Sequence, residues 1–552
     1  MNVVSVYLAA HDSSAALIAD GKMYAIELER LSRIKHSCDH DVLTREYLDN
    51  RIATKPEHVR ETALQAIDYL LRAAGKTVAD VDVTMTCNLA GARRLDDATA
   101  RVVSPTHHEQ HAASAYYPSS FDEAAVLVLD NFGERNPENP QLRETVSIWH
   151  GRGRSLRHVR TIYSPAYQFA NTPDECTVHH SPGNFYTDCT VYSGFKVLDG
   201  GKTMGLSPYG TARLVEPVLA HVKFRDDGRI DFDRAYQQLI RDDLAARGDT
   251  FEARADVAYA AQIVLERCVD FYCKLAHKLV GSTNLCLAGG IALNSVANGK
   301  ILGRTPFQQL FVQPAAKDSG LALGKALAAF YHFEENHGIE LDYRGYYLGA
   351  PYGYDATIAS VRSDPAFTTT TLEGDALYAS VARLLADGKI VAWFQGGCEF
   401  GPRALGHRSI LCNPMLADMK DVLNARVKHR EAFRPFAPSV LAEHAKDYFA
   451  ITVPSPYMLL VADVTSDAIP AVTHVDHSAR LQTLDRATDE RFYKLISAFR
   501  DITGVPVLLN TSFNVRGQPI VETPDEAVST FRDTEIDVLV LGDHVIEKRR
   551  AQ

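Results

Sequence analysis

Short apolar segments, all but one of which end at turns containing Gly or Asp, place the strongest constraint on the fold of this 552-residue chain. They lie at residues 3–9, 15–19, 23–28, 125–129 and 284–288. A long helical pattern covers residues 255–280, and a further helix is expected from Ile291. Strands that alternate with helices in this way predict an α/β fold.

A change of composition near residues 343–371 predicts a boundary between two domains. YRGYYLGAPYGYD is rich in Gly and Tyr, and SDPAFTTTTLEG is polar. Beyond this stretch an apolar helical face ends at Asp387-Gly388, and a strand is expected at residues 390–394. We therefore expect one domain at residues 1–350 and a second at residues 351–552.

The charge balance argues against several classes of protein. Lys and Arg number 58 and Asp and Glu number 69, which gives a net charge of −11, whereas binders of nucleic acid or anionic membranes need a basic surface. No apolar run approaches the roughly 18 residues that span a bilayer, and the N-terminus is typical of a first strand, not of a signal peptide. The nine cysteines include no CxxC pair, which indicates reduced thiols. We expect a cytoplasmic protein without nucleic-acid or membrane partners, and a homodimer is the default oligomer.

His107 and His111, in SPTHHEQHAASA, are candidate metal ligands because a helix would place them on one face. Among 21 histidines, chance gives about one pair at this spacing, so the pair alone does not decide between ligands and ordinary histidines. Asp130 ends a predicted strand, and Asp318 precedes a helix of small residues. Together the four would suit Fe(II), Mn(II) or Zn(II). The alternative for each aspartate is a helix cap or a turn.

Three turns in the first domain are candidate phosphate-binding loops. LAGGIALN places Gly289 and Gly290 between a strand and a helix, where backbone N–H groups attract anions. GGKTMGLSPYG places Lys202 among residues that permit close backbone approach. HDSSAALI brings His11 to the first turn after the first strand. Each motif alone is equally consistent with a structural turn.

Basic residues of the second domain gather in the short motifs EFGPRALGHRSIL, NARVKHREAFRPFAPSVL, SARLQTL and NTSFNVRGQPIVE. The candidate residues in these motifs are Arg403, Arg408, Arg426, Lys428, Arg430, Arg434, Arg480, Thr483, Ser512 and Asn514. Arginine forks bind phosphate oxygens in pairs, and lysine adds a point charge. The motifs therefore predict an anion site, and the alternative is a solvated basic face paired with acids.

Seven segments occur in the order found in the NodU/CmcH-type O-carbamoyltransferases of nodulation-factor and antibiotic biosynthesis. They are HDSSA, ELERLSRIKH, HHEQHAASA, GKTMGLSPYG, GGIALN, EFGPRALG with VKHREAFRPFAPS, and NTSFNVRGQPIV. The chain resembles this family over essentially its whole length. The resemblance implies an actin/hexokinase-like first domain, of the threonylcarbamoyl-transferase type, and a YrdC-like α/β second domain.

The resemblance also implies two half-reactions. The second domain would make carbamoyladenylate from carbamoyl phosphate and ATP with Mg²⁺, and the first would transfer the carbamoyl group to a hydroxyl of a small natural product or sugar. By motif match, a divalent metal, Fe²⁺ first and Mn²⁺ or Zn²⁺ next, would bind His107, His111, Asp130 and Asp318. The implied phosphate or nucleotide contacts are Gly289, Gly290, Asn294, Arg403, Lys428, Arg434, Arg480, Ser512 and Asn514, and the composition of the motifs adds Lys202, Arg430 and Thr483. The implied catalytic residues are His11, Lys428 and Arg434.

The acceptor stays open among an aminoglycoside, another sugar, a macrolide and a nodulation oligosaccharide, and loops 131–143 and 163–190 are expected to shape its pocket. The sequence departs from the family pattern at His407, Gly397-Cys398, the LCNP after Ile410, and Lys317. Two other hypotheses are a tRNA threonylcarbamoyl-modifying enzyme, which predicts an extended basic surface, and a non-catalytic nucleotide-binding scaffold, which predicts lost ligands. A hydrogenase-maturation enzyme would need zinc-type Cys pairs, which this sequence lacks.

Overall fold

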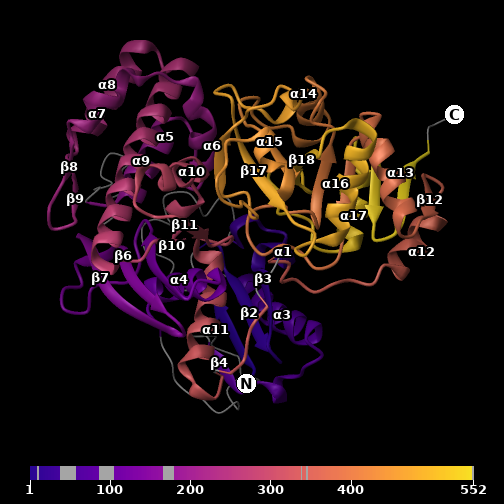
Figure 1. The fold of residues 1–552 in the computed structure, drawn as a ribbon, viewed down its shortest axis with the longest axis horizontal. Helices are drawn as coiled ribbons and strands as arrows, with labels where there is room; N and C mark the ends of the chain where they lie inside the picture. Colours follow the sequence, from indigo (N-terminus) through magenta and orange to yellow (C-terminus); the bar gives the residue numbers. More distant parts are fainter. Residues whose placement is uncertain are drawn as a thin grey trace. The chain divides into compact units, whose positions relative to one another are not determined.

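The computed structural model describes residues 1–8, 11–37, 57–85, 105–165, 180–336, 338–342 and 346–549. The chain forms two compact units, coloured from indigo to yellow along the sequence in Figure 1. The first unit comprises residues 1–21, 38–64 and 78–340, and the second comprises residues 22–37, 65–77 and 341–552. The second unit is therefore assembled from segments that are far apart in the sequence.

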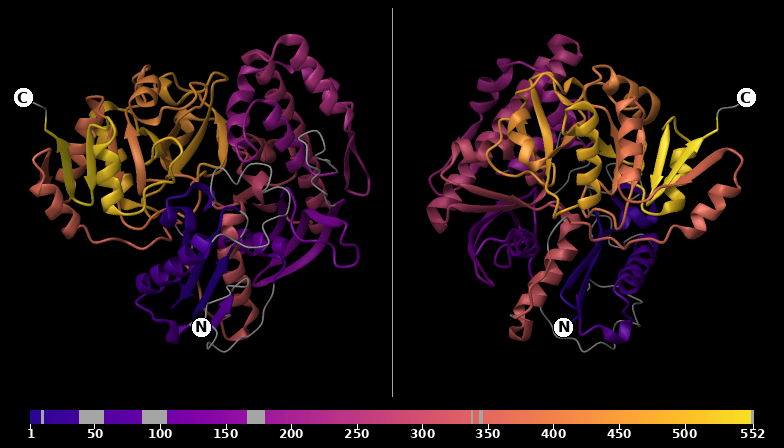
Figure 2. Two further views of the ribbon diagram at one scale, coloured as in Figure 1. Left: turned by 180° about the vertical axis from the view of Figure 1, so that it is seen from behind. Right: turned by 45° about the vertical axis from the view of Figure 1, so that its right-hand side comes forward.

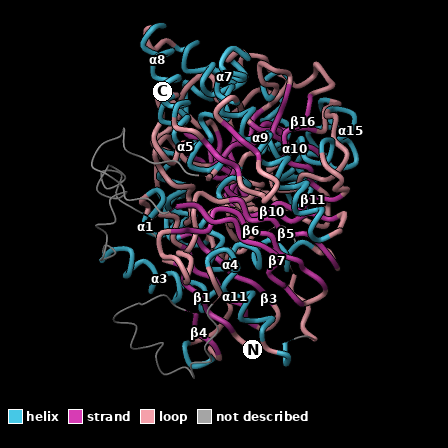
Figure 3. Tube along the Cα trace, turned by 90° about the vertical axis from the view of Figure 1, so that its left-hand side faces the viewer, coloured by secondary structure: helices cyan, strands magenta, loops and turns pink. Residues whose placement is uncertain are grey.

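Two sheets form the framework of the first unit. The strands are β1 (Val3–Tyr7), β2 (Ser14–Ala19), β4 (Val83–Met85), β5 (Glu123–Leu129), β6 (Leu142–Arg152), β7 (Ser155–Pro165), β10 (Asn284–Ala288) and β11 (Gln309–Val312), with a separate hairpin of β8 (Val222–Phe224) and β9 (Ile230–Phe232). β1 pairs antiparallel with β2 and parallel with β4. The five-stranded sheet has the order β11-β10-β5-β6-β7, in which β5 pairs antiparallel with β6 and parallel with β10, and Figure 3 shows its strands side by side.

The same pairing pattern, one antiparallel and one parallel neighbour on a central strand, thus occurs twice in the first unit. β2 is buried at every position, and β5 and β10 are buried at all but their first residue. Continuous burial of this kind explains why these strands have near-continuous apolar sequences without polar alternation. The predicted α/β class is confirmed.

Helices of the first unit pack between and around these sheets. They are α4 (His107–Tyr116), α5 (Pro182–Tyr192), α6 (Gly200–Leu206), α7 (Val215–Leu219), α8 (Ala235–Arg247), α9 (Phe251–Val280), α10 (Ser295–Arg304) and α11 (Leu321–His332). α9 begins after the Thr250 cap, whose side chain accepts from Ala253 N–H, and ends at Gly281 with a φ of 80°. α4 packs against α11, β10 and β5, which brings its histidines close to Asp130 at the carboxyl end of β5.

The second unit is built on one mixed sheet with the order β12-β20-β19-β13-β14-β18-β15-β17-β16. The strands are β12 (Phe367–Thr371), β13 (Val391–Phe394), β14 (Arg408–Cys412), β15 (Ala437–Leu441), β16 (Leu460–Asp463), β17 (Ser478–Leu484), β18 (Val507–Ser512), β19 (Val538–Leu541) and β20 (His544–Lys548). The helices are α12 (Asp355–Ser363), α13 (Asp375–Ala386), α14 (Met419–Leu423), α15 (Ala445–Tyr448), α16 (Glu490–Thr503) and α17 (Pro524–Arg532). α13 and α16 pack against each other, and Figure 2 shows the unit from two further sides. Its core includes the fully buried Trp393 of the central strand β13.

Two N-terminal elements also belong to the second unit, namely β3 (Lys22–Glu27) and α1 (Leu28–Ser32), whereas α3 (Glu57–Ala73) is divided between the units. Two local expectations differ from the structure. The polar stretch expected near the domain boundary holds α12 and the edge strand β12, because the β-branched threonines of FTTTT favour a strand despite their polarity. The helix expected from Ile291 is first a 3-10 turn (Gly290–Leu293), and α10 follows. No described helix combines the length and the hydropathy that crossing a membrane requires.

Candidate functional site

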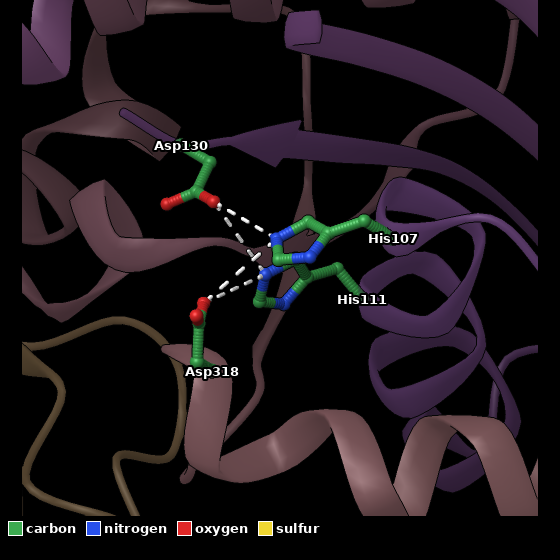
Figure 4. Close-up of side chains that lie close together, drawn as sticks. All are labelled: His107, His111, Asp130 and Asp318. Atoms are coloured by element: carbon green, nitrogen blue, oxygen red, sulfur yellow. Dashed lines mark hydrogen bonds and ion pairs between the residues drawn. The ribbon is translucent and has the colours of Figure 1, made fainter. Parts of the chain in front are cut away.

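The four predicted metal ligands come from three elements of the first unit. His107 and His111 lie one turn apart on α4, whose start is fixed by a capping box. Asp130 directly follows β5, and Asp318 opens the short 3-10 turn that leads into α11. Figure 4 shows the four side chains pointing toward one another.

The Nε2 atoms of both histidines face the same two carboxylate oxygens. His107 Nε2 lies 3.2 Å from Asp130 Oδ2 and 3.8 Å from Asp318 Oδ1, and His111 Nε2 lies 3.7 Å from each of these oxygens. One donor atom from each residue lies within 4.8 Å of the other three. Among the described residues, neither ring nitrogen of the fully buried His111 makes a hydrogen bond. A buried imidazole in this state beside two carboxylates fits a divalent-metal site of mixed nitrogen and oxygen ligands.

The ionisation of this cluster favours bound positive charge. Burial disfavours a charge on Asp130, but the two neighbouring histidines outweigh burial and hold the pKa of Asp130 well below its usual value. Burial likewise disfavours a charged His111, but the carboxylates of Asp130 and Asp318 raise its pKa to about 9. Either protons or a cation would satisfy these carboxylates.

The Gly289-Gly290 turn holds Asp130 in place. Gly290 N–H donates to Asp130 Oδ1 at 3.1 Å. Gly289 has a φ of 90° and a ψ of 162°, and a Cβ at this position would lie 2.2 Å from the carbonyl oxygen of Leu129. Only glycine fits such a backbone at such a close approach. The turn therefore helps to position Asp130, a predicted metal ligand, and its contact with a nucleotide stays a prediction.

Asn294 and Lys202, the other nucleotide contacts predicted in this unit, have protein partners. Asn294 caps α10, since its Oδ1 accepts from Ala297 N–H at 3.0 Å. Lys202 Nζ lies 2.9 Å from an oxygen of Asp199. Nucleotide binding by these two residues also stays a prediction.

His11 is held by a carboxylate that a lysine also contacts. His11 Nδ1 lies 3.0 Å from Asp12 Oδ2, and Lys317 Nζ pairs with Asp12 Oδ1. Burial disfavours a charge on His11, but the hydrogen bond and the charge of Asp12 outweigh burial and raise the pKa of His11 to about 9. Asp12 therefore orients this imidazole and stabilises its protonated form, and a catalytic role of His11 stays a prediction.

Tyr7 lies beside two of the predicted metal ligands, and the sequence did not single it out. Its hydroxyl oxygen lies 3.4 Å from His107 Nδ1 and 3.5 Å from Asp318 Oδ2. Tyr7 is the last residue of β1, so the available signal was its place at the carboxyl end of a predicted strand.

Lys428 is the centre of the predicted anion site in the second unit. It is 5% exposed and ends a π-helical turn (Asn424–Lys428). Its Nζ donates to the backbone oxygens of Ser512 and Asn514, each at 2.8 Å, and to Asn514 Oδ1 at 2.9 Å. Ser512 and Asn514, predicted as phosphate contacts, therefore hold Lys428 through their oxygen atoms. Burial lowers the pKa of Lys428 well below its usual value.

Four arginines add positive charge that few acids balance. Burial and the charge of Arg434 lower the pKa of Arg403 to about 10 and that of Arg430 to about 9. Burial, together with the charges of these three arginines, lowers the pKa of Arg480. Among the described residues, the Nε atoms of Arg403, Arg430 and Arg480 make no hydrogen bond. Glu431 lies 3.7 Å from Arg434. Clustered cations with unused donors favour an anionic ligand.

Other polar residues of the same motifs have structural partners. Arg408 is fully buried and donates to four backbone oxygens. Arg426 donates to Asp537 Oδ1 at 2.9 Å. Thr483 Oγ1 accepts from Ser455 N–H at 2.8 Å, and phosphate binding by Thr483 stays a prediction. The composition of the motifs alone did not distinguish these residues, which have structural partners, from Arg403 and Lys428 in the predicted anion site.

Comparisons with known proteins give two family matches and several relatives. Residues 87–327 match the family model Carbamoyltransferase N-terminus, and residues 382–548 match Carbamoyltransferase C-terminus. An uncharacterized protein of Synechocystis sp. is 36% identical over 98% of this chain and 95% of its own length. Nodulation protein NolNO of Sinorhizobium fredii is 33% identical over 98% of this chain and 79% of its own length. The 3'-hydroxymethylcephem-O-carbamoyltransferase of Amycolatopsis lactamdurans is 28% identical over 97% of both chains.

Proposed function

Because the chain belongs to the carbamoyltransferase family and is thus an enzyme of carbamoyl transfer, we propose that it carbamoylates a hydroxyl group of a small natural product or sugar. The name of one relative, a 3'-hydroxymethylcephem-O-carbamoyltransferase, supports a hydroxyl acceptor. The observation that carries the proposal is the buried cationic cluster around Lys428, which would serve to bind the phosphates of an activated carbamoyl donor.

Residues 351–552 would form carbamoyladenylate. Water would cleave carbamoyl phosphate to carbamate and inorganic phosphate, and a carbamate oxygen would then attack the α-phosphorus of ATP and expel pyrophosphate. Both steps place negative charge on phosphate oxygens, which guanidinium and ammonium groups stabilise. We assign Lys428 and Arg434 to the reacting phosphate, and Arg403, Arg430 and Arg480 to the remaining phosphate oxygens. Mg²⁺ with ATP would supply further neutralisation.

Residues 1–350 would transfer the carbamoyl group from the adenylate to the acceptor hydroxyl, with release of AMP. His107, His111, Asp130 and Asp318 would hold a divalent metal such as Fe²⁺, Mn²⁺ or Zn²⁺, which supplies Lewis-acid polarisation when bound. His11 would orient the acceptor hydroxyl, and it would take the proton in the fraction of the protein in which its ring is neutral, a fraction that grows as the pH rises toward 9.

The acceptor would be bound by polar and aromatic side chains of the first unit. Loop 131–143 lies within the described residues, whereas residues 166–179 of the other predicted loop lie outside them. The chemistry of donor activation is common to all hydroxyl acceptors, so the first test leaves the acceptor out.

Purified protein is incubated with ATP and carbamoyl phosphate, and pyrophosphate and nucleotide products are followed by mass spectrometry. The wild type and Lys428→Ala are compared, with the exposed Lys446→Ala as a matched control. The proposal expects pyrophosphate formation that requires carbamoyl phosphate, is lost in Lys428→Ala and is kept in Lys446→Ala. Equal activity in the wild type and Lys428→Ala would contradict it, and so would a wild type that forms no pyrophosphate with Mg²⁺, Mn²⁺ and Fe²⁺ present.

A further inference from the structure

The segment Lys22–Ser37 belongs to the second unit although it lies near the N-terminus. It contains β3 and α1, and Ala25 N–H donates to Leu348 O at 2.9 Å. Two arginines of this segment, Arg30 in α1 and Arg33 at its C-cap, contact backbone carbonyl groups of the second unit. Neither arginine was among the predicted site residues.

Arg30 donates hydrogen bonds to the loop that carries Arg403. Its side chain is 1% exposed, and its Nη2 donates to Glu399 O at 3.2 Å and to Gly401 O at 3.0 Å. Glu27 supplies a carboxylate 3.4 Å from Arg30 Nε. A buried guanidinium is costly unless it is paired, so this one is committed to holding the start of the loop.

The carboxylate of Glu399 fixes the same loop from within. Its Oε1 accepts from the backbone N–H groups of Leu405 at 2.7 Å, His407 at 2.8 Å and Arg408 at 3.1 Å. Arg403 lies between the carbonyl groups that Arg30 binds and the N–H groups that Glu399 binds. The path of the backbone through Arg403 is therefore fixed on both sides.

Arg33 donates hydrogen bonds to the segment that follows Ser512 and Asn514, the two residues that accept from Lys428. Its Nη1 donates to Ile520 O at 2.8 Å and its Nη2 to Pro519 O at 3.0 Å. Asn514, which accepts from Lys428, donates through Nδ2 to Gln518 O at 2.6 Å. Arg33 therefore acts on the turn that orients Asn514.

The same segment also brings charge to the anion site. Burial, then the charges of Arg430, Arg434 and Lys35, lower the pKa of Lys428. Lys35 is two residues beyond Arg33, so the segment lies close enough to Lys428 for electrostatic contact.

We propose that Arg30 and Arg33 are positioning residues, which set the separation of the Arg403 loop and the Lys428 ammonium group and so determine the affinity of the second unit for carbamoyl phosphate. This inference rests on the proposed function of that unit. The two arginines tie α1 to two chain segments, the loop that carries Arg403 and the segment that follows Asn514. A displacement of about 1 Å at a reacting group costs up to about 100-fold in rate, so small movements of α1 are sufficient to matter.

The test compares full-length wild type with Arg30→Met, Arg30→Lys and Arg33→Met. Arg72→Met is the control, because Arg72 is an exposed arginine of the same unit whose side chain donates to its own helix, at Asp68 O. Four quantities are measured: the thermal midpoint, the KM and the kcat for carbamoyl phosphate in pyrophosphate formation, and the Kd for inorganic phosphate by calorimetry.

The expected result is a kcat/KM lower by about 10- to 100-fold in Arg30→Met and Arg33→Met, mostly through KM, with a matching rise in the phosphate Kd. Arg30→Lys should recover part of the loss, since an ammonium group can still reach one carbonyl oxygen, and Arg72→Met should resemble the wild type. Folded variants with a wild-type KM and phosphate Kd would overturn the inference, even if their thermal midpoints fall. If Arg30→Met does not fold, Arg33→Met and Arg30→Lys decide by the same criteria. If the wild type forms no pyrophosphate, the proposed function fails, and the phosphate Kd still tests the positioning role.

Discussion

Replacement of Gly289 by alanine should disturb the predicted metal site without changing any of its four predicted ligands. The backbone of Gly289, with a φ of 90° and a ψ of 162°, lies in a region that residues with a Cβ avoid at a cost of about 1–3 kcal/mol. The new methyl group would also lie 2.2 Å from Leu129 O. Relief of that overlap must move either the end of β5 or the turn.

Either movement breaks the hydrogen bond from Gly290 N–H to Asp130 Oδ1, which adds about 1 kcal/mol. The summed loss of about 2–4 kcal/mol in the free energy of unfolding corresponds to a fall of about 4 °C or more in the melting of the first unit. Loss of a partner that orients a metal ligand typically lowers metal affinity about 10- to 100-fold.

The assay is a competition titration with Zn²⁺ as the probe metal, together with thermal melting. Gly201→Ala is the matched control, because Gly201 lies in α6 and a methyl group added there would meet no neighbouring atom within 4 Å. Alanine at this position should be neutral or stabilising by up to about 1 kcal/mol. A Gly289→Ala protein that melts with the wild type and binds Zn²⁺ with unchanged affinity would refute the reasoning.

Three further predictions follow from the two sites. Lys428→Met should lower the rate of adenylate formation by about 100-fold or more. Carbamoyl transfer from externally supplied adenylate should be unchanged, and an equal loss in both assays would contradict the assignment of the two half-reactions to different units. Asp318→Asn should abolish tight binding of Zn²⁺ while the second unit still forms pyrophosphate, which separate titration and product assays would check. In metal-free protein, His11 and His111 both have a pKa raised to about 9, so their stabilising contribution is complete below about pH 6.5, the ordinary histidine value, and is lost as the pH rises toward 9. Thermal melts should therefore show a stability that falls from pH 6 to pH 9, and the fall should be smaller in His11→Gln than in the wild type. An equal fall in both proteins would contradict a stabilising role of protonated His11.

Features set by local sequence were predictable. The strand that ends at Asp130 and the strand before Gly289 are apolar runs of characteristic length, and a spacing of four residues put His107 and His111 on one helical face. The family resemblance then connected these segments with Asp318. The strand β12 was missed because its threonines are polar, although their branched side chains suit an exposed sheet edge.

Features set by distant partners were not predictable from residue type. Arg403 and Arg408 lie in one motif, yet Arg408 donates to surrounding backbone oxygens whereas Arg403 is buried beside the charge of Arg434, which helps to lower its pKa. His407, one of the positions that depart from the family pattern, stacks on Tyr347 with ring centres 3.7 Å apart. Nothing in the sequence around either residue indicates that pairing. Contacts of this kind depend on the folded path of the chain.

The discontinuity of the second unit has a consequence for biosynthesis. Arg30 and Glu399 are separated by 369 positions, and at about 5–20 residues per second the ribosome needs about 20–70 s to make that length. During this interval the arginine has left the ribosome, but the carbonyl groups that it binds do not yet exist. The second unit therefore completes its fold only after nearly the whole polypeptide has emerged, and a chain that began at Leu341 would lack the helix that closes it.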